Sequence, residues 1–188
     1  MKSYLFSACL YTLFTAVAFG IGYPLIITGI AQLTMRNRAN GQILMRNKVA
    51  SGSALMGQPF TGPGYFHSRP SAAGTGYDAS ASSGSNYGPT NKALIDRIEA
   101  STKAENTGAP VPVDLVTASG SGLDPDVTPA AAFYQVGRVA EERHLPVSNV
   151  QKLVEESVTP RQFGLLGEPR VNVLRLNMAL DQQPGPTH

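Results

Sequence analysis

The sequence predicts an α+β fold: a single N-terminal transmembrane helix, then one mixed helix/strand extramembrane domain with a Gly/Ser-rich loop region. First, residues 3–35 carry no charged side chain, a run well beyond the roughly 18 apolar residues typical of a transmembrane helix. Second, the rest of the chain is polar with interspersed charge and, at about 150 residues, matches one domain with one core. We therefore assign residues 1–35 to an N-terminal tip and transmembrane helix, and residues 36–188 to the domain, whose loop-rich part is 51–90.

The apolar run is longer than a bilayer requires. As a helix, residues 4–33 would extend about 45 Å at ~1.5 Å per residue, whereas the hydrocarbon layer is about 30 Å thick. The helix must therefore tilt, bend or protrude. Pro24 predicts a bend, because its ring faces the carbonyl of Gly20 and it donates no backbone hydrogen bond.

The alternative for this run is a cleaved secretory signal peptide. Lys2 would be its basic start, and Ala16 and Ala18 would form the small-residue cleavage pattern. However, the apolar run continues through residues 19–27, where a mature secreted domain would already be polar. This continuation favours a retained anchor.

Small residues recur every four positions along the anchor, and they would form one ridge on the helix. Such ridges let a second helix approach closely in lipid, where packing drives association. Small residues are also common in transmembrane helices, so chance spacing stays open as the alternative. The residues of this packing ridge are Ala8, Thr12, Ala16 and Gly20.

Charge alone favours a cytoplasmic domain. Only Lys2 and the terminal amine precede the span, and no acid follows it before Asp78. Positive residues concentrate on the cytoplasmic side of membrane proteins; those that follow the span here are Arg36, Arg38, Arg46 and Lys48. The single cysteine, Cys9, lies within the span and suits either compartment. The nearly balanced charge beyond the anchor provides no basic field for nucleic acid, so no nucleic-acid partner is expected.

Helix and strand signals follow the anchor in order. Glycines interleaved with aromatic residues in 51–90 favour an ordered, loop-rich surface over a flexible linker. An amphipathic helix begins after Asn91, and the alternation in residues 111–117 predicts a strand. Thr128 before Pro129 is typical of a helix start, and Ser148 with Gln151 predicts a capping box for the next helix. Residues 164–181 then predict a strand or a strand-to-helix ending.

Motifs for catalysis are mostly absent. The sequence contains neither Gly-Lys-Ser/Thr nor Asp-Lys-Thr-Gly, so it has no phosphate-binding loop and no aspartyl-phosphate acceptor. The histidines His67, His144 and His188 are far apart, so no metal site is predicted. Residues 74–78 (GTGYD) are similar to a potassium selectivity filter, but the missing glycine after the tyrosine favours a glycine-rich turn. A Ser-His-acid triad with His67 or His144 stays open, without an elbow motif or Ser-x-x-Lys to support it.

Four long strings in a fixed order carry a family resemblance: GSALMGQPFTGPGYFHSRPSA, SGSNYGPTN, SGLDPDVTPAAAFYQVGRVA and LGEPRVNVLRLNMALD. Together with the anchor, they make the chain similar to the C subunits of Kdp-type potassium-transporting ATPases, over nearly its whole length. The resemblance implies an accessory subunit of a high-affinity ATP-driven potassium uptake complex in the bacterial inner membrane. This subunit is needed for assembly and acts as a catalytic chaperone that promotes ATP use, without carrying the phosphorylated Asp.

The resemblance also implies partners and a placement. The partners are a channel-like potassium-binding subunit, a P-type ATP-hydrolysing subunit, a further small membrane subunit and the lipid bilayer. No covalently bound cofactor is implied, and ATP would be bound through the complex. The domain would lie in the periplasm and the N-terminal tip in the cytoplasm, contrary to the charge count. Long domains can cross despite flanking charge, and a periplasmic domain favours stabilisation and gating of potassium uptake over direct nucleotide binding.

The matching strings nominate residues that would contact a partner or a nucleotide: Gln58, Phe60, Tyr65, Phe66, Arg69, Pro70, Ser71, Ser85, Asn86 and Asn91. Arg69 stands in a nearly uncharged stretch and should find a carboxylate or carbonyls on its own domain or a partner, and Tyr65 and Phe66 are suited to anchor an interface. Stabilisation of the domain's own loops is the alternative for each. Tyr87 departs from the aliphatic residue expected after Ser-Asn. Two other functions stay open: a membrane-anchored periplasmic serine-type hydrolase and a generic anchored scaffold protein.

Overall fold

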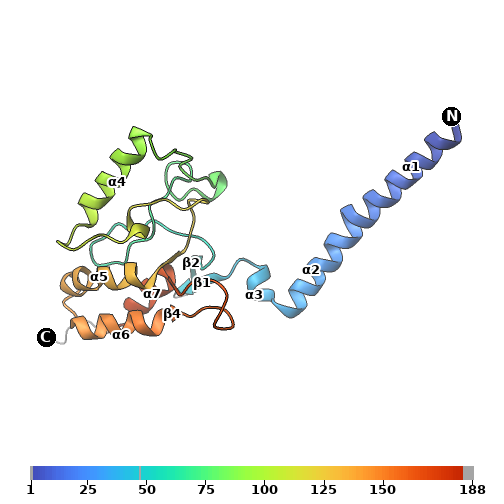
Figure 1. Ribbon diagram of the computed structural model, residues 1–188. Coiled ribbons are helices and arrows are strands. Elements are labelled where there is room, and N and C mark those ends of the chain that lie inside the picture. Colours follow the sequence, from blue (N-terminus) through green and yellow to red (C-terminus); the bar gives the residue numbers. More distant parts are fainter. Residues whose placement is uncertain (1, 47, 184–188) are drawn as a thin grey trace. The chain divides into compact units, whose positions relative to one another are not determined.

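The structure is a computed structural model that describes residues 2–46 and 48–183 and separates into two units, Met1–Ile43 and Leu44–His188 (Figure 1). The boundary groups residues 36–43 with the N-terminal helix, although the sequence assigns them to the domain. His188, one of the three histidines considered as metal ligands, lies outside the described residues.

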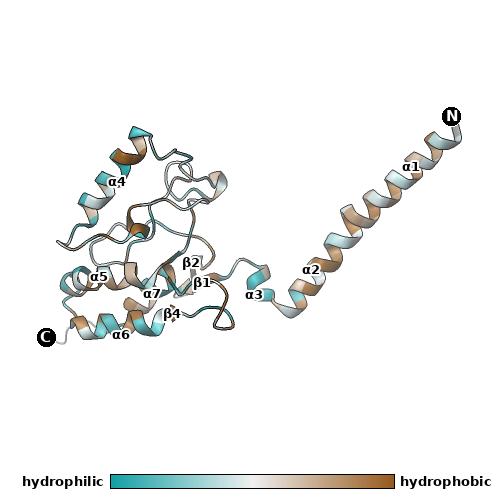
Figure 2. Ribbon diagram, viewed as in Figure 1, coloured by the Kyte–Doolittle hydropathy of each residue, from teal (hydrophilic) through white to brown (hydrophobic). Residues whose placement is uncertain are grey.

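The first unit is a continuous apolar helix followed by a short turn of helix. It comprises α1 (Lys2–Val17), a π-helical turn η1 (Ala18–Gly22), α2 (Tyr23–Thr34) and α3 (Arg36–Ala39). Residues Ser3–Thr34 are long and apolar enough to cross a membrane, and Figure 2 shows how hydrophobic residues dominate this stretch. In the π-helical turn the Tyr23 N–H donates to the Ala18 carbonyl. Because Pro24 has no N–H to donate to Gly20, the wider turn accommodates the break in the hydrogen-bond ladder.

The second unit combines helices with two small sheets, which confirms the predicted α+β fold. The strand order in the three-stranded sheet is β3-β5-β4, and β5 pairs antiparallel with both neighbours, Val171 facing Val127 and Val158. A separate two-stranded sheet joins β1 to β2. In chain order the elements are β1 (Ile43–Arg46), β2 (Val49–Ser53), η2 (Ala79–Ala81), α4 (Lys92–Glu105), η3 (Val113–Leu115), β3 (Asp126–Val127), α5 (Pro129–Glu142), α6 (Val147–Ser157), β4 (Val158–Thr159), β5 (Arg170–Asn172) and α7 (Val173–Leu180).

The core lies among α5, α6, α7 and the three-stranded sheet. Burial on α5 repeats every three to four residues, so that Ala132, Val136 and Val139 face inward, as expected for an amphipathic helix. Phe66 reaches into this same core from the glycine-rich segment and is fully buried. The glycine-rich segment is thereby part of the domain's packing.

Several predicted elements begin where their capping residues indicate. The Thr128 hydroxyl accepts a hydrogen bond from the Ala131 N–H at the start of α5, and the Asn91 side chain accepts one from the Ala93 N–H at the start of α4. The strand-to-helix ending is confirmed by β5 and α7.

Two predictions are wrong. Residues 111–117 are not a strand, and Val113–Leu115 within them form the 3₁₀ turn η3. Asp114, Leu115 and Val116 are all buried, whereas a strand would alternate its faces. The capping box is also absent, since α6 begins at Val147 after Pro146 with no side-chain cap. The β1–β2 hairpin was missed, because its short strands lie in a stretch that reads as loop.

Candidate functional site

Two buried amides fix the glycine-rich segment against the helices. The Asn177 side chain on α7 accepts a hydrogen bond from the Phe66 N–H and donates one to the Phe66 carbonyl, both at 2.9 Å. The Gln135 side chain on α5 does the same for His67, at 2.7 and 3.2 Å. Each amide therefore mimics the edge of a neighbouring strand and satisfies backbone groups that have no ladder partner.

Arginines on α5 extend this attachment. Arg138 donates to the carbonyls of Pro63 and Tyr65, and Arg143 donates to the Gly64 carbonyl at 2.7 Å. The Arg143 guanidinium also lies 4.4 Å from the centre of the Tyr65 ring, within the range of a cation–π contact. Residues 63–67 are therefore held along their whole length by side chains from helices.

Asp181, at the end of α7, forms ion pairs with two arginines. Its carboxylate pairs with Arg143 at 2.7 Å and with Arg46 from β1. Burial raises the pKa of this carboxyl, but the hydrogen bonds and charges of the two arginines outweigh burial, so its pKa lies below the ordinary value. The Asp181–Arg46 ion pair joins the hairpin at the start of the second unit to the C-terminal helix.

Arg69 finds the carboxylate that the sequence predicts, on its own domain. Its guanidinium lies 3.2 Å from Asp124 and also donates to the Thr117 carbonyl at 3.4 Å. Ser71 organises the adjacent turn, since its hydroxyl donates to the Gly122 carbonyl at 2.6 Å and accepts the Tyr77 N–H at 2.7 Å. These contacts favour loop stabilisation as the role of both side chains.

A polar cavity of about 340 Å³ lies beside this turn. It is open to solvent and contains one cationic side chain, Arg97 of α4, which donates to the Ser71 carbonyl at 2.7 Å. Burial raises the pKa of the nearby Tyr77 hydroxyl, against the lowering effect of Arg97. One arginine among hydroxyls and glycine backbone suits a small polar or anionic ligand. The lining residues are Ser71, Ala72, Gly74, Thr75, Gly76, Gly84, Ser85, Tyr87 and Arg97.

The GTGYD segment is a glycine-rich turn in the structure. The N–H groups of Gly76 and Asp78 both donate to the Ala73 carbonyl, which closes residues 73–78 on themselves. The carbonyls of a selectivity filter instead form stacked rings contributed by several loops.

A second cavity, of about 270 Å³, contains the pair that a serine hydrolase would need. His67 Nδ1 and Glu105 Oε1 are 2.6 Å apart, the geometry of a base and its orienting carboxylate. Burial raises the pKa of Glu105, but the hydrogen bond and charge of His67, with the charge of Arg138, bring it below the ordinary value. The other ring nitrogen faces the Gly62 carbonyl at 3.2 Å. Ser68 lines the same cavity, but its buried hydroxyl has no partner among the described residues, so no serine–histidine hydrogen bond completes a triad.

The structure distributes the nominated residues over several places instead of one site. Ser71 and Ser85 share the cavity with Arg97, whereas Phe60 and Pro70 line the cavity with His67. Phe60 also contacts Tyr65, with ring centres 5.7 Å apart.

The remaining nominated residues have structural surroundings of their own. Phe66 was expected to anchor an interface, but its side chain is enclosed by the domain's own core. Asn91 caps α4. The Gln58 amide lies over Gly52, where a Cβ would meet it at 1.8 Å. Asn86 is exposed in a left-handed backbone conformation, with φ of 53°.

The residues of the transmembrane ridge are all exposed on the first unit. Ala8, Thr12 and Ala16 lie on α1, whereas Gly20 lies in the π-helical turn. A π-helical turn contains more residues than an α-helical turn, so a spacing of four residues no longer keeps side chains on one face there. No atom lies within 4 Å of a Cβ built on Gly20.

Sequence reasoning missed the groups that hold the glycine-rich segment: Gln135, Asn177, Arg138, Arg143 and Asp181. A signal existed for Gln135, because it lies on the apolar face of α5 between Ala132 and Val139, and a buried amide needs partners. Among the described residues, no group of three or more His, Cys, Asp or Glu side chains is placed to hold a metal ion.

Similarity to known proteins covers almost the whole chain. The protein family described as "K+-transporting ATPase, c chain" matches residues 5–182. A protein of Acidobacterium capsulatum is 61% identical over 181 residues, which cover 96% of this chain and 98% of that protein. A protein of Koribacter versatilis is 55% identical and covers 100% of this chain and 99% of its own length. Both carry the name potassium-transporting ATPase KdpC subunit, and the chain belongs to this family of C subunits of the potassium-transporting ATPase.

Proposed function

We propose that this chain is the accessory subunit of a high-affinity, ATP-driven potassium uptake complex in the bacterial inner membrane, needed for assembly of that complex. The observation that carries the proposal is the family match over residues 5–182, which includes both the apolar helix and the second unit. The helix at Ser3–Thr34 would be the membrane anchor. The partners would be a channel-like potassium-binding subunit, a P-type ATP-hydrolysing subunit and a further small membrane subunit.

The second unit would act as a rigid brace for the potassium pathway on the periplasmic side. Its glycine-rich segment is held by the Gln135 and Asn177 amides and by Arg138 and Arg143, so a partner that binds it meets a surface that is already ordered. Preorganisation of this kind reduces the entropy lost on association. The subunit would then promote ATP use by the pump subunit as a catalytic chaperone, by stabilising an assembled state.

Direct contact with a nucleotide is the second candidate for this chaperone role. The cavity beside Arg97 favours it, since one guanidinium, serine hydroxyls and glycine backbone surround about 340 Å³, within the range of small-molecule sites. Arg97→Gln in the purified complex separates the two routes. If the second unit acts as a brace, the substitution leaves the dependence of ATP hydrolysis on ATP concentration unchanged. If the cavity contacts the nucleotide directly, the substitution raises the ATP concentration needed for half-maximal hydrolysis.

Co-purification from mild detergent tests the proposal as a whole. A tagged chain should recover a multi-span channel-like protein and a pump subunit containing Asp-Lys-Thr-Gly, with ATP hydrolysis that depends on potassium. Ala16→Leu should reduce recovery, because leucine fills the small-residue ridge, whereas Val17→Leu adds bulk beside it and should not. A chain that elutes alone, under conditions that preserve other membrane complexes, would contradict the proposal.

A labelling experiment tests the periplasmic placement. Cys9 is the only cysteine, so Cys9→Ala with Lys152→Cys puts a single thiol on exposed α6 of the second unit. A membrane-impermeant maleimide should label this thiol in spheroplasts before lysis. Labelling only after lysis would place the domain in the cytoplasm, as the charge count favours.

A further inference from the structure

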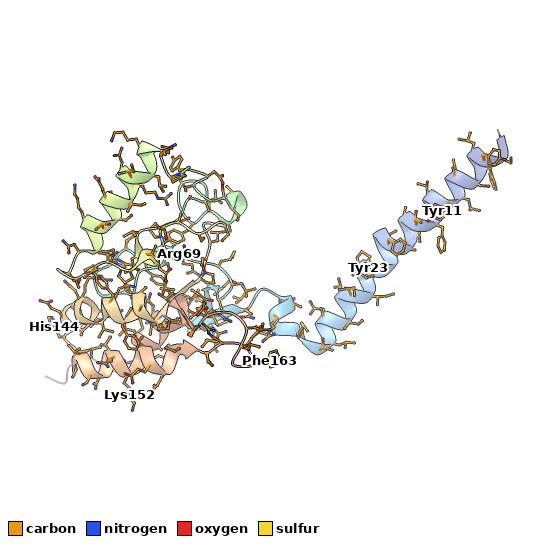
Figure 3. All side chains as sticks on the ribbon, in the orientation of Figure 1. Tyr11, Tyr23, Arg69, His144, Lys152 and Phe163 are labelled. Carbon is orange, nitrogen blue, oxygen red and sulfur yellow. The ribbon has the colours of Figure 1, made fainter. Side chains whose placement is uncertain are left out.

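The helix α4 lies against the rest of the second unit without contributing to its core. None of its side chains is fully buried, whereas α5, α6 and α7 each bury several. Its apolar side chains Leu94 and Ile98 are only half-buried, and Ile95 is exposed. In Figure 3, α4 stands at the outer edge of the second unit, with the loop that carries Arg69 between it and α5. Apolar burial therefore contributes little to holding α4 in place.

Polar contacts hold α4 instead. In its first half, the Arg97 guanidinium donates to the Ser71 carbonyl at 2.7 Å. At its end, the Glu105 carboxylate lies 2.6 Å from Nδ1 of His67, and the Tyr134 hydroxyl of α5 donates to the Glu105 backbone carbonyl at 2.9 Å. One of these three contacts involves histidine, the side chain that changes its charge between about pH 5 and 8.

Both ring nitrogens of His67 face hydrogen-bond acceptors. Nδ1 faces the Glu105 carboxylate, and Nε2 lies 3.2 Å from the Gly62 carbonyl oxygen. A neutral imidazole has one N–H to donate, whereas an imidazolium has two. Only the protonated ring can therefore donate to both acceptors, because a neutral ring leaves a nitrogen lone pair facing an oxygen at one of them. The His67 backbone is held by the Gln135 amide, so the ring extends from a fixed position.

Glu105 keeps its negative charge over the range in which histidine titrates. Burial raises the pKa of Glu105, but the hydrogen bond and charge of His67, with the charge of Arg138 on α5, bring it below the ordinary value. The carboxyl group is therefore ionised above about pH 5. Lys103, two positions earlier on α4, is exposed to solvent. The charge that changes in this pair at neutral pH is that of the His67 ring.

Charged side chains on the neighbouring elements are engaged elsewhere. Arg69, two positions after His67, pairs with Asp124 at 3.2 Å. Asp114 of η3 accepts a hydrogen bond from the Thr128 N–H at 2.8 Å. Protonation of the His67 ring is therefore governed by Glu105 and the Gly62 carbonyl, with Arg138 as the nearby positive charge.

We propose that His67 is a pH-sensitive latch for α4: its imidazolium binds the Glu105 carboxylate and the Gly62 carbonyl together, and loss of one proton loosens the end of α4 that carries Glu105. The stabilisation is present at the lower pH and is lost as the pH rises through the titration of the ring. The bond from Tyr134 remains, so this end is loosened and not released.

The latch also controls a cavity. The end of α4 lines the cavity of about 270 Å³ that contains His67 and Glu105, so loosening this end opens that cavity to solvent. The latch does not depend on the proposed function. In a periplasmic domain it would respond to the pH outside the cytoplasm.

Amide hydrogen exchange of the full-length chain in detergent, at about pH 5.5 and about pH 8, tests the latch. Each measured rate is divided by the intrinsic rate of an unstructured amide at the same pH, so that only protection is compared. Protection at the end of α4, residues 101–105, should fall about tenfold at the higher pH, the factor expected for loss of a charge-assisted hydrogen bond. The amides of α6, which packs on α5 and α7, should keep their protection.

Three variants identify the titrating group. His67→Gln removes the ring, so protection at the end of α4 should be the same at both pH values. Glu105→Gln replaces the ion pair by a neutral contact and should reduce the dependence on pH. His144→Gln is the matched control, because the His144 side chain is exposed just after α5, and this variant should keep the dependence of the wild-type chain.

Equal protection of α4 at the two pH values in the wild-type chain would overturn the latch. An undiminished dependence on pH in His67→Gln or in Glu105→Gln would also overturn it, since another group would then be titrating. Equal losses of protection in α4 and α6 would do the same, because the whole second unit would then be loosening. If His67→Gln does not fold, Glu105→Gln and the wild-type chain still decide the question.

Discussion

The helical layer and the glycine-rich segment of the second unit are stabilised by different forces. In the helical layer, α5, α6 and α7 bury apolar side chains such as Val139, Val154 and Leu176 against one another. In residues 54–91, only a short 3₁₀ turn, η2, interrupts the irregular backbone. That segment is instead held by hydrogen bonds from distant side chains to its backbone, such as those of Asn177 to Phe66.

This difference changes how each region should respond to substitution. Apolar packing tolerates exchanges that conserve volume, which usually change stability by less than about 1.5 kcal/mol. A buried backbone group that loses its only partner costs about 1–3 kcal/mol. The helical layer should therefore tolerate conservative changes of side chain, whereas the glycine-rich segment should depend on a few polar atoms.

The largest effect is expected from Asn177→Leu. The substitution keeps the side chain's approximate size but leaves both the N–H and the carbonyl of Phe66 without partners, so we expect the free energy of unfolding to fall by about 4 kcal/mol. Urea unfolding of the full-length chain in detergent, followed by circular dichroism, measures the change. Hydrogen exchange at the Phe66 amide should become faster, and the protection free energy calculated from its rate should fall by about as much as the free energy of unfolding.

Met178→Leu on the same helix is the matched control, because it exchanges two apolar side chains of similar volume. It should change the unfolding free energy by less than about 1.5 kcal/mol. If the two variants were equally stable, apolar burial alone would hold the glycine-rich segment, and the contrast between the two regions would disappear.

The next effect compares Gly122, whose carbonyl accepts a hydrogen bond from Ser71 of the glycine-rich segment, with a glycine of the helical layer. Gly122 has a φ of 65°, and a Cβ there would lie 2.5 Å from the Ser83 carbonyl oxygen. We expect Gly122→Ala to reduce stability by about 3 kcal/mol, through the left-handed conformation and the backbone clash. Gly137 on α5 has open space around it, so Gly137→Ala should stabilise the chain by up to about 1 kcal/mol. Thermal unfolding of both variants gives the comparison, and a loss of stability in both would contradict it.

The same contrast explains what the sequence could predict. The start of α5 follows from Thr128, Pro129 and the apolar spacing that comes after them, all of which are local. The path of residues 54–91 depends on partners more than a hundred positions away, such as Asn177 for Phe66. The spacing of apolar residues along the sequence does not indicate such a distant pairing. The strand prediction for residues 111–117 is wrong for a different reason: their residue types alternate as in a strand, although the segment contains the 3₁₀ turn η3.

The candidate site shows the same limit. An arginine in an uncharged stretch must find acceptors, so a partner for Arg69 could be predicted, although its identity as Asp124 could not. Phe66 was nominated for an interface because aromatic residues near glycines suit both burial and contact, and only the fold decides between them. Ser71 and Ser85 meet in one cavity because separate turns fold together.

A smaller effect is expected at Asp181, which pairs with Arg143 and Arg46 and also accepts a hydrogen bond from the Tyr65 hydroxyl of the glycine-rich segment at 3.4 Å. Asp181→Asn should lower the unfolding free energy by about 2 kcal/mol at neutral pH, because both pairings lose their charge. The pKa of Asp181 is lowered in the folded state. Its contribution is therefore present above the unfolded pKa of about 3.9 and is lost as pH falls through the folded pKa.

Unfolding curves measured from neutral pH into acid test this dependence. The difference between the wild-type chain and Asp181→Asn should shrink as the pH falls below about 4. Asp96→Asn is the control, since the exposed Asp96–Lys92 pair should contribute less than about 0.5 kcal/mol at any pH. A difference that stays constant into acid would show that Asp181 acts by shape and not by charge.

The smallest effect, and one of opposite sign, is expected at Ser68. Its hydroxyl is buried and lacks a hydrogen-bond partner in the part of the chain that the structure describes, so Ser68→Ala removes an unpaired polar group and should raise stability by up to about 1 kcal/mol. Ser71→Ala is the contrasting variant, because the Ser71 hydroxyl bonds to Gly122 and Tyr77 and its loss should destabilise. If Ser68→Ala also destabilises the chain, the Ser68 hydroxyl has a partner, such as a buried water in the cavity with His67 and Glu105. The hydrogen bond to that partner would then be one more polar contact that holds the glycine-rich segment.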